Sequence, residues 1–284
     1  MDIFIMTVSI PLDSDTMQEV KELLQEDKVN YASLLSVDEL TDSHIKGFCV
    51  LAYDDESDKL VGVLTSIDRL ETGDFEWSAV VSPSIRREGI GTGLVAELDR
   101  NLALRGATYD LALVPEDSQE AQEWLKKIGY VYDFTERTMV AKAVETEVQS
   151  EVNIMPYTSE EPEVMEVLIS AFGDTLDEVS NFIAYNTQTP NRKLWIASLE
   201  NKVVGTFAIV EDLDKLWITG LGVHEQASGK GVATAVLGWA KNEAKRLGKA
   251  SIYLDVEIDN EKALAVYKKA GFETIHHTHY YQKG

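Results

Sequence analysis

The segment at residues 260–272 carries the side chain most suited to acid–base chemistry. Asn260, Ala263 and Tyr267 lie three and four residues apart, so they share one face of an expected helix. A tyrosine hydroxyl, with a reference pKa of about 10, can donate a proton to a leaving group. Asn260 also suits the N-cap of this helix, and Tyr267 also suits a core position. We favour proton transfer for Tyr267 because a second chemical motif precedes it in the chain.

Two glycine-rich loops, at residues 81–93 and 223–234, each lead from an expected strand into an expected helix. Free N–H groups and the positive end of the helix dipole make such a start favourable for an anion. Small residues let phosphates approach the backbone. The candidate contacts are Val81, Arg86, Arg87, Gly89, Ile90, Gly91 and Thr92 in the first loop and Val223, Ser228, Gly229, Lys230, Gly231, Val232, Ala233 and Thr234 in the second. The glycines are also compatible with a tight turn that binds nothing.

Two nucleotide-binding motifs fit these loops poorly. A P-loop requires Ser or Thr after Gly-Lys, whereas Gly231 follows Gly229 and Lys230. Asp110 and Asp255 lie near the spacing of a dinucleotide-binding fold. That fold, however, needs most of its βαβ units after the loop, and here most strands precede it. A nucleotide-binding oxidoreductase is therefore disfavoured.

Both loops resemble the pyrophosphate signature of the GNAT superfamily of N-acetyltransferases, at residues 81–91 and 228–233. Residues 260–272 are similar to the family's Asn-x-x-Ala-x-x-x-Tyr-x-x-x-Gly-Phe motif at every specified position. Ser228 departs from the Arg or Gln usual in the family. In the first half Ser118 and Leu125 stand at the Asn and Tyr positions. Because leucine cannot transfer a proton, the resemblance implies that the first copy is degenerate.

The resemblance implies an acetyl-CoA-dependent N-acetyltransferase that moves an acetyl group directly to a primary amine in a ternary complex, without a metal. Tyr267 would be the general acid, and Asn260 would join the cofactor-binding residues. Backbone N–H groups near Leu221 and Val223 would polarise the thioester carbonyl, and the glycines at 220 and 222 predict a bulge there. The base that deprotonates the amine stays open among Glu211, Asp212, Asp214, Glu225 and Glu257.

The elements that position these residues occur twice. At a constant shift of 142 residues, Val81 corresponds to Val223 and Gly89 corresponds to Gly231. This register holds without a gap to residues 130 and 272. Such self-similarity indicates a duplication. In the second half we expect strands at 152–155, 194–198, 203–210, 216–223 and 251–256, helices at 160–172, 175–185, 232–247 and 261–269, and a terminal hairpin.

These patterns predict an α/β (α+β) fold of two tandem GNAT-like domains, each with a mixed, mostly antiparallel central sheet flanked by helices. Residues 1–144 would form the degenerate N-terminal domain and residues 152–284 the catalytic C-terminal domain. The polar segment at 145–151 would be the linker. Acceptor sites are expected before each glycine loop, at residues 31–44 and 172–188.

Composition is that of a globular protein, with 44% hydrophobic and 26% charged residues. A net charge of −23 disfavours nucleic acid and anionic membranes as partners and is compatible with a cationic amine. Cys49 lies in an apolar run and is expected to be a small core residue. His276, His277 and His279 match no metal-site spacing. No membrane span or signal peptide is recognised, so a cytoplasmic location is expected.

Two questions stay open at the level of sequence. A non-catalytic acyl-CoA-binding or regulatory protein is the alternative to an enzyme, favoured by Leu125 and Ser228 and opposed by Asn260 and Tyr267. The acceptor amine, small molecule or peptide, is not identified, and the protein could be a monomer or a homodimer.

Overall fold

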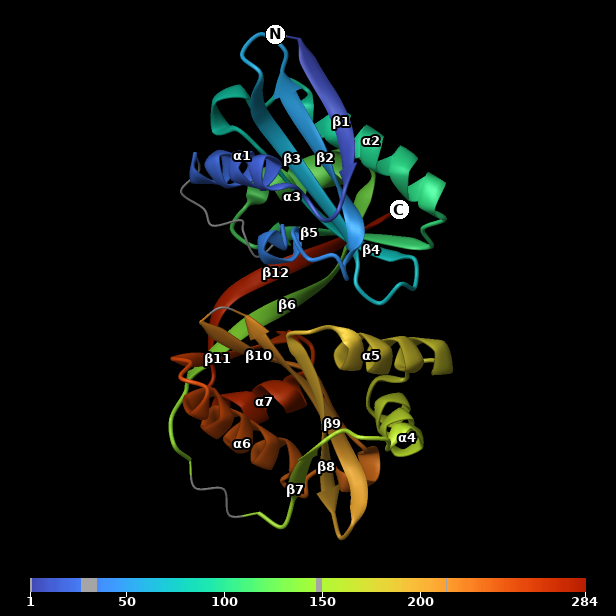
Figure 1. The fold of residues 1–284 in the computed structure, drawn as a ribbon, viewed down its shortest axis with the longest axis vertical. Helices are drawn as coiled ribbons and strands as arrows, with labels where there is room; N and C mark the ends of the chain where they lie inside the picture. The colour runs from blue at the N-terminus through green and yellow to red at the C-terminus, as the bar shows by residue number, and fades with distance from the viewer. Residues whose placement is uncertain (1, 27–34, 147–149, 213) are drawn as a thin grey trace. The chain divides into compact units, whose positions relative to one another are not determined.

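The computed structural model of the protein describes residues 2–26, 35–146, 150–212 and 214–284 (Figure 1). Its contacts divide the chain into two units. Unit 1 is Met1–Asp133 together with His279–Gly284, and unit 2 is Phe134–Thr278. The two units differ from the expected boundaries at residues 144 and 152, because the last strand of each repeat contributes residues to both units. Of the expected linker, residues 147–149 lie outside the described residues.

Unit 1 is a mixed sheet with helices on it. Its elements are β1 (Ile3–Ser9), α1 (Ser14–Gln25), β2 (Lys46–Asp54), β3 (Lys59–Asp68), β4 (Asp74–Val81), α2 (Ile90–Arg105), β5 (Tyr109–Pro115) and α3 (Gln119–Lys127). The strand order is β1-β2-β3-β4-β5-β12, where β12 is Glu273–Lys283. The pairs from β1 to β4 are antiparallel, and β4 pairs with β5 in parallel.

Unit 2 repeats this plan. Its elements are β7 (Asn153–Pro156), α4 (Glu161–Phe172), α5 (Leu176–Gln188), β8 (Arg192–Leu199), β9 (Lys202–Asp212), β10 (Lys215–Val223), α6 (Val232–Arg246), β11 (Ser251–Glu257) and α7 (Glu261–Lys269). The strand order is β6-β11-β10-β9-β8-β7, where β6 is Tyr130–Lys142. Only the β10–β11 pair is parallel among the recorded pairs of this unit. The expected fold class is confirmed, and so are the expected strands and helices up to residue 269.

The ends of the two repeats are exchanged. Residues 136–142 of β6 pair antiparallel with β11 of unit 2. The end of β12 belongs to unit 1, where Tyr281 is 2% exposed in the core and the Gly284 N–H donates to the Gly129 carbonyl oxygen at 2.9 Å. The expected terminal hairpin is wrong, because β12 is one continuous strand. Residues 273–283 contain no Gly, Pro, Asn or Asp that could reverse the chain.

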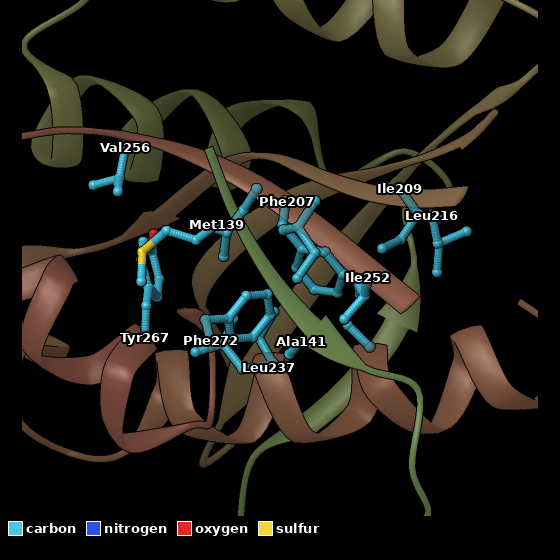
Figure 2. Packing of buried hydrophobic residues seen from close by; sticks show 14 of the residues in the cluster. Met139, Ala141, Phe207, Ile209, Leu216, Leu237, Ile252, Val256, Tyr267 and Phe272 are labelled. Carbon is cyan, nitrogen blue, oxygen red and sulfur yellow. The ribbon is translucent and has the colours of Figure 1, made fainter. Parts of the chain in front are cut away.

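The sheet of unit 2 has an apolar layer on each face. Phe207 and Ile209 of β9 pack with α6 and α7, whereas Ala208 between them packs with α4 and α5. This alternation is the period of two of a strand that is buried on both faces. Figure 2 shows the first of these layers, in which Ile209 of β9 lies beside Leu216 of β10, and Phe207 and Leu237 of α6 belong to the same cluster.

In unit 1 the corresponding layer includes buried residues of α2 and α3 on the sheet. Cys49 of β2 is 0% exposed, as expected of a core residue, and burial raises the pKa of its thiol to about 12. Such a thiol is protonated and unreactive at neutral pH.

Candidate functional site in unit 2

The parallel strands β10 and β11 part at one end. Their recorded pairing covers three residues and ends at Trp217 and Tyr253, although β10 continues to Val223 and β11 to Glu257. Beyond Trp217 and Tyr253, the backbone N–H and C=O groups of β10 and β11 that face each other form no recorded pairs between these two strands. Such groups are available to a ligand that lies between the strands.

A β-bulge deforms β10 beside this parting. Thr219 pairs with Ala208 and Gly222 pairs with Thr206, so two residues of β10 oppose one residue of β9. Gly220 lies within the bulge at φ +57, in the left-handed region that favours glycine. The bulge expected from the two glycines is therefore confirmed, at the strand end that leads into the glycine loop.

The second glycine loop presents an open backbone at the start of α6. Gly229 and Gly231 have φ values of +76 and +80, and a methyl group on either would meet no atom within 4 Å. Gly231 is the N-cap of α6, and no side chain caps its first N–H groups. Ser228 and Lys230 are exposed, and Ala233 and Thr234 lie in the first turn. An anion can replace the missing cap here, with Lys230 supplying positive charge.

Tyr267 lies in the core layer next to the parting. It packs in the same cluster as Leu221 of β10 and Val256 of β11, both beyond the last paired residues. Figure 2 shows its ring beside Met139 of β6, with Val256 nearby. The side chain is 8% exposed, and burial raises the pKa of its hydroxyl to about 12. The group therefore keeps its proton at neutral pH.

The hydroxyl of Tyr267 has no hydrogen-bond partner among the described residues. Asn260 is the N-cap of α7, and its Oδ1 accepts from the Ala263 N–H at 3.1 Å. Asn260 therefore caps α7, whether or not it also contacts the cofactor. The short cap also fixes where α7 begins, and so how Tyr267, two turns later, meets the sheet.

The five candidate bases are spread over the edges of unit 2. Glu211 lies 3.5 Å from Lys193, Asp214 is exposed near the start of β10, and Glu257 is exposed at the end of β11. Glu225 follows the bulge and lines a surface groove of about 720 Å³. Of the five, it is the one that this groove includes.

Two aromatic rings from residues 172–188, the segment expected to hold the acceptor, cover the bulge. A methyl group on Gly220 would lie 2.3 Å from Cζ of Phe182, and one on Gly222 would lie 3.1 Å from Cε2 of Phe172. Both rings come from the α4–α5 pair, on the sheet face opposite Tyr267. The paired glycines were the available signal, because a strand gives up its side chains where another group must approach.

The corresponding site of unit 1 keeps the open helix start but differs in its strands and in the side chains of its loop. The pairing of β3 with β4 is regular from Gly62↔Val81 to Ile67↔Glu76, without a bulge. Arg86 Nε donates to the Val81 carbonyl oxygen at 3.1 Å, and Arg87 forms an ion pair of 2.7 Å with Glu120. Gly89 is an open N-cap as in unit 2, and Thr92 is exposed in the first turn.

Two further residues distinguish the unit 1 site. The ring of Trp124 lies 3.3 Å from a methyl group placed on Gly91, and Leu125 is 1% exposed in the core. Ile90 and its counterpart Val232 are also buried, so their side chains serve the core and only their backbones can reach a ligand. The structure thus brings the first-loop residues together without a proton donor.

Both units thus have a parallel strand pair that parts before an uncapped glycine loop. The profile of the Acetyltransferase (GNAT) family matches residues 17–130 and 160–272. The chain belongs to this family, with two copies of its domain, and the family implies acetyltransferase activity.

Solved structures share the whole architecture. A GCN5-related N-acetyltransferase from Sphaerobacter thermophilus is 18% identical, with a TM-score of 0.74 and coverage of 98% of this chain and 95% of that one. A tandem GNAT protein from the clavulanic acid biosynthesis pathway is 14% identical, with a TM-score of 0.71 and 98% of each chain covered. A putative acetyltransferase from Pyrococcus horikoshii is 18% identical, with a TM-score of 0.61 and coverage of 99% and 89%. At these identities the likeness establishes the fold.

None of the described helices combines the length and apolarity that a bilayer crossing requires. Within the same residues, no three His, Cys, Asp or Glu side chains gather as metal ligands would.

Proposed function

We propose that unit 2 transfers an acetyl group from acetyl-CoA to a primary amine, directly and without a covalent acetyl-enzyme. The observation that carries this proposal is the position of Tyr267. Tyr267, whose hydroxyl keeps its proton, belongs to one core cluster with Leu221 and Val256, which lie where β10 and β11 have parted, and the glycine loop of this unit presents an uncapped helix start.

The residues present suit acetyl-CoA as the co-substrate. The open backbone at Gly229 and Gly231 would hold the pyrophosphate, together with the N–H groups of residues 232–234 and the charge of Lys230. Ser228 offers a hydroxyl in place of a longer side chain, so the backbone makes the larger contribution. The edge of β10 that faces away from β9, at Leu221 and Val223, would hold the part of the cofactor between the phosphates and the thioester.

When bound, acetyl-CoA supplies an activated acetyl group and a thiol as leaving group. Backbone N–H groups at the bulge around Leu221 donate toward the carbonyl oxygen, where negative charge develops. Tyr267 gives the proton of its hydroxyl to the departing sulfur. Its raised pKa suits this role, because the proton is present throughout the physiological range.

The substrate ammonium must lose a proton before its nitrogen can attack. Glu225 is our proposed acceptor among the five candidates, directly or through water, because it lies on the groove beside the bulge. The negative net charge of the chain also favours a substrate that carries an ammonium group. We expect the protein to act in the cytoplasm as a monomer or a homodimer, without nucleic acid or membrane partners.

Unit 1 supports a second, non-catalytic role. Its cradle at Arg86–Gly91 keeps an open helix start, but Leu125 cannot donate a proton and both arginines have partners within the protein. These residues favour a unit 1 that binds acyl-CoA weakly or not at all. Its role would be to support the fold.

The test is calorimetric titration of the full chain with acetyl-CoA, followed by a CoA-release assay on a panel of amines. We expect saturable binding and release of CoA with at least one amine. Binding without release from any amine would favour a non-catalytic acyl-CoA-binding protein. Absence of binding would contradict the proposal.

A further inference from the structure

The sheet of unit 1 begins with an edge strand, β1, which pairs with β2 on one side only (Figure 1). Its sequence contains no charged residue, no proline and no glycine. The register with β2 is unbroken along all seven residues, so no bulge twists the strand away. Natural edge strands are usually blocked by a charge, a proline, a bulge or a short length, and β1 has none of these features.

The other edge strand provides the contrast. In unit 2, β7 has only four residues and ends in Pro156, which has no N–H to donate. This edge is therefore protected against a further strand, whereas β1 is open to one.

The backbone groups that β1 turns outward can be assigned from the two ends of the strand. The Asp55 N–H donates to the Asp2 carbonyl oxygen at 3.0 Å, and the Ile10 N–H donates to the Gly47 carbonyl oxygen at 3.2 Å. Hydrogen-bonded pairs alternate with non-bonded pairs in an antiparallel ladder, so the even-numbered residues use their backbone groups toward β2. The outward N–H and C=O groups belong to Ile3, Ile5, Thr7 and Ser9. These groups have no recorded partner elsewhere in the described part of the chain.

The side chains of β1 differ between the two faces of the sheet. Ile3 and Ile5 pack on the core of unit 1, and hydrogen bonds to α2 hold the Thr7 hydroxyl. On the other face Phe4 is 55% exposed and Met6 is 36% exposed. The strand is therefore held firmly in place while it presents an apolar surface and an unpaired backbone edge.

We propose that β1 pairs antiparallel with β1 of a second copy of this chain, about a two-fold axis at Met6. Residues with outward backbone groups must then face one another. In this register Ile3 lies opposite Ser9 of the partner subunit and Ile5 lies opposite Thr7 of the partner subunit. Every outward backbone group of the strand gains a hydrogen bond in this way.

Three properties favour a second copy over a different partner strand. A strand that pairs antiparallel with itself obeys two-fold symmetry, so the assembly closes as a dimer. The same register covers Phe4 with Val8 of the partner subunit and covers Met6 with its own copy. Because β1 is uncharged, two chains with a net charge of −23 can meet without a carboxylate on the pairing strands. One pair of strands buries less than the roughly 1,200 Å² of a standard interface, so we expect a reversible dimer.

The first experiment is disulfide cross-linking of single-cysteine substitutions in the full chain under mild oxidation. Met6→Cys places two thiols opposite each other in a non-hydrogen-bonded pair, where Cα atoms lie about 4.5 Å apart, within disulfide range. We expect a covalent dimer on a non-reducing gel. The native thiol of Cys49 gives no background because it is 0% exposed.

Two matched substitutions serve as controls for the cross-link. Met155→Cys introduces a thiol of similar exposure, 38%, on the protected edge strand β7. Phe4→Cys introduces a more exposed thiol on β1 itself, but the proposed register places it opposite Val8 of the partner subunit. Both should stay largely monomeric under the same oxidation.

Charge substitution provides a second test, which needs no cysteine. Sedimentation velocity of the unchanged protein should show a monomer–dimer equilibrium as the concentration rises to about 100 µM. Met6→Lys places like charges opposite each other and should weaken dimerisation by about tenfold. An equimolar mixture of Met6→Lys and Met6→Glu should dimerise again, because Lys then faces Glu across the axis. Met155→Lys should dimerise like the unchanged protein.

Three results would overturn this inference. They are a monomer over the whole concentration range, equal cross-linking of Met6→Cys and Phe4→Cys, and a charge-swapped mixture that stays monomeric. None of these measurements involves acetyl-CoA or an amine, so each leaves the proposed function untouched.

Discussion

The hydroxyl of Ser78 donates a hydrogen bond to the carbonyl oxygen of Leu113, at 3.1 Å, across the line where β4 and β5 part. In the repeat, Ser78 corresponds to Gly220, which has no side chain and lies in the bulge. The same position therefore bridges the two strands in unit 1 and opens the backbone in unit 2. This difference predicts that the two copies do not bind acetyl-CoA equally.

We expect one tight acetyl-CoA site per chain. Gly231→Asp should abolish it, because a carboxylate at the uncapped start of α6 repels phosphate and a side chain at φ +80 strains the loop. Gly89→Asp, the matched change in unit 1, should leave the tight site intact. Calorimetry of both variants makes the comparison. Two equal sites in the unchanged protein would show that the bridge at Ser78 does not close unit 1.

Tyr267→Phe should lower kcat by roughly 100-fold, the smaller end of the range for a lost general acid, with little change in acetyl-CoA affinity. Turnover equal to that of the unchanged protein would remove Tyr267 from the mechanism. Tyr280→Phe is a suitable control, because this tyrosine is equally buried, at 8% exposure, on β12.

The pKa of Tyr267 gives a second, independent measurement. Burial raises it from 10 to about 12, so the folded protein holds this proton more firmly than the unfolded chain. The resulting stability is fully present below pH 10 and is lost as pH rises toward 12. Difference absorbance titration of the protein against Tyr267→Phe should show a phenol that ionises near pH 12. Ionisation near pH 10 would mean that the hydroxyl is hydrated.

The position of the C-terminal strand predicts which core is destabilised by a substitution in it. Tyr281→Ala should lower the free energy of unfolding by about 3 kcal/mol, because it empties a large site in the unit 1 core. Ile275→Ala, on the same strand but 43% exposed, should cost far less. Hydrogen exchange should report the loss within unit 1 first. Equal effects of the two changes would contradict the assignment of the strand end to that core.

Two threonines of unit 2 with buried hydroxyls should respond differently to the same change. Thr206→Val removes a hydroxyl that donates to the Trp195 carbonyl oxygen at 3.0 Å, and should destabilise the protein by about 1 kcal/mol. Thr219→Val removes a hydroxyl that has no partner, and should leave stability unchanged or increase it. Denaturant unfolding measures both. A loss for Thr219→Val equal to that for Thr206→Val would indicate a partner for its hydroxyl.

Local patterns in the sequence determined much of this protein. The duplication, the α/β elements of each half, the helix starts at Gly89 and Gly231 and the bulge at Gly220 follow from glycine geometry and from periods of two and of 3.6 residues. The helix at 261–269 with Tyr267 on its inner face follows in the same way. These features depend on neighbours in the chain, so a single sequence contains them.

Tertiary structure alone decided the rest. Which core receives Tyr281 depends on pairing between strands that lie far apart in the chain, and no local pattern records it. The rings of Phe172 and Phe182 reach the bulge only because α4 and α5 pack on that face of the sheet. Thr219 reads as an ordinary strand residue until its register with Ala208 shows which face it points to. Register and face are properties of non-local contacts, and they determine which side chains lie together at the bulge.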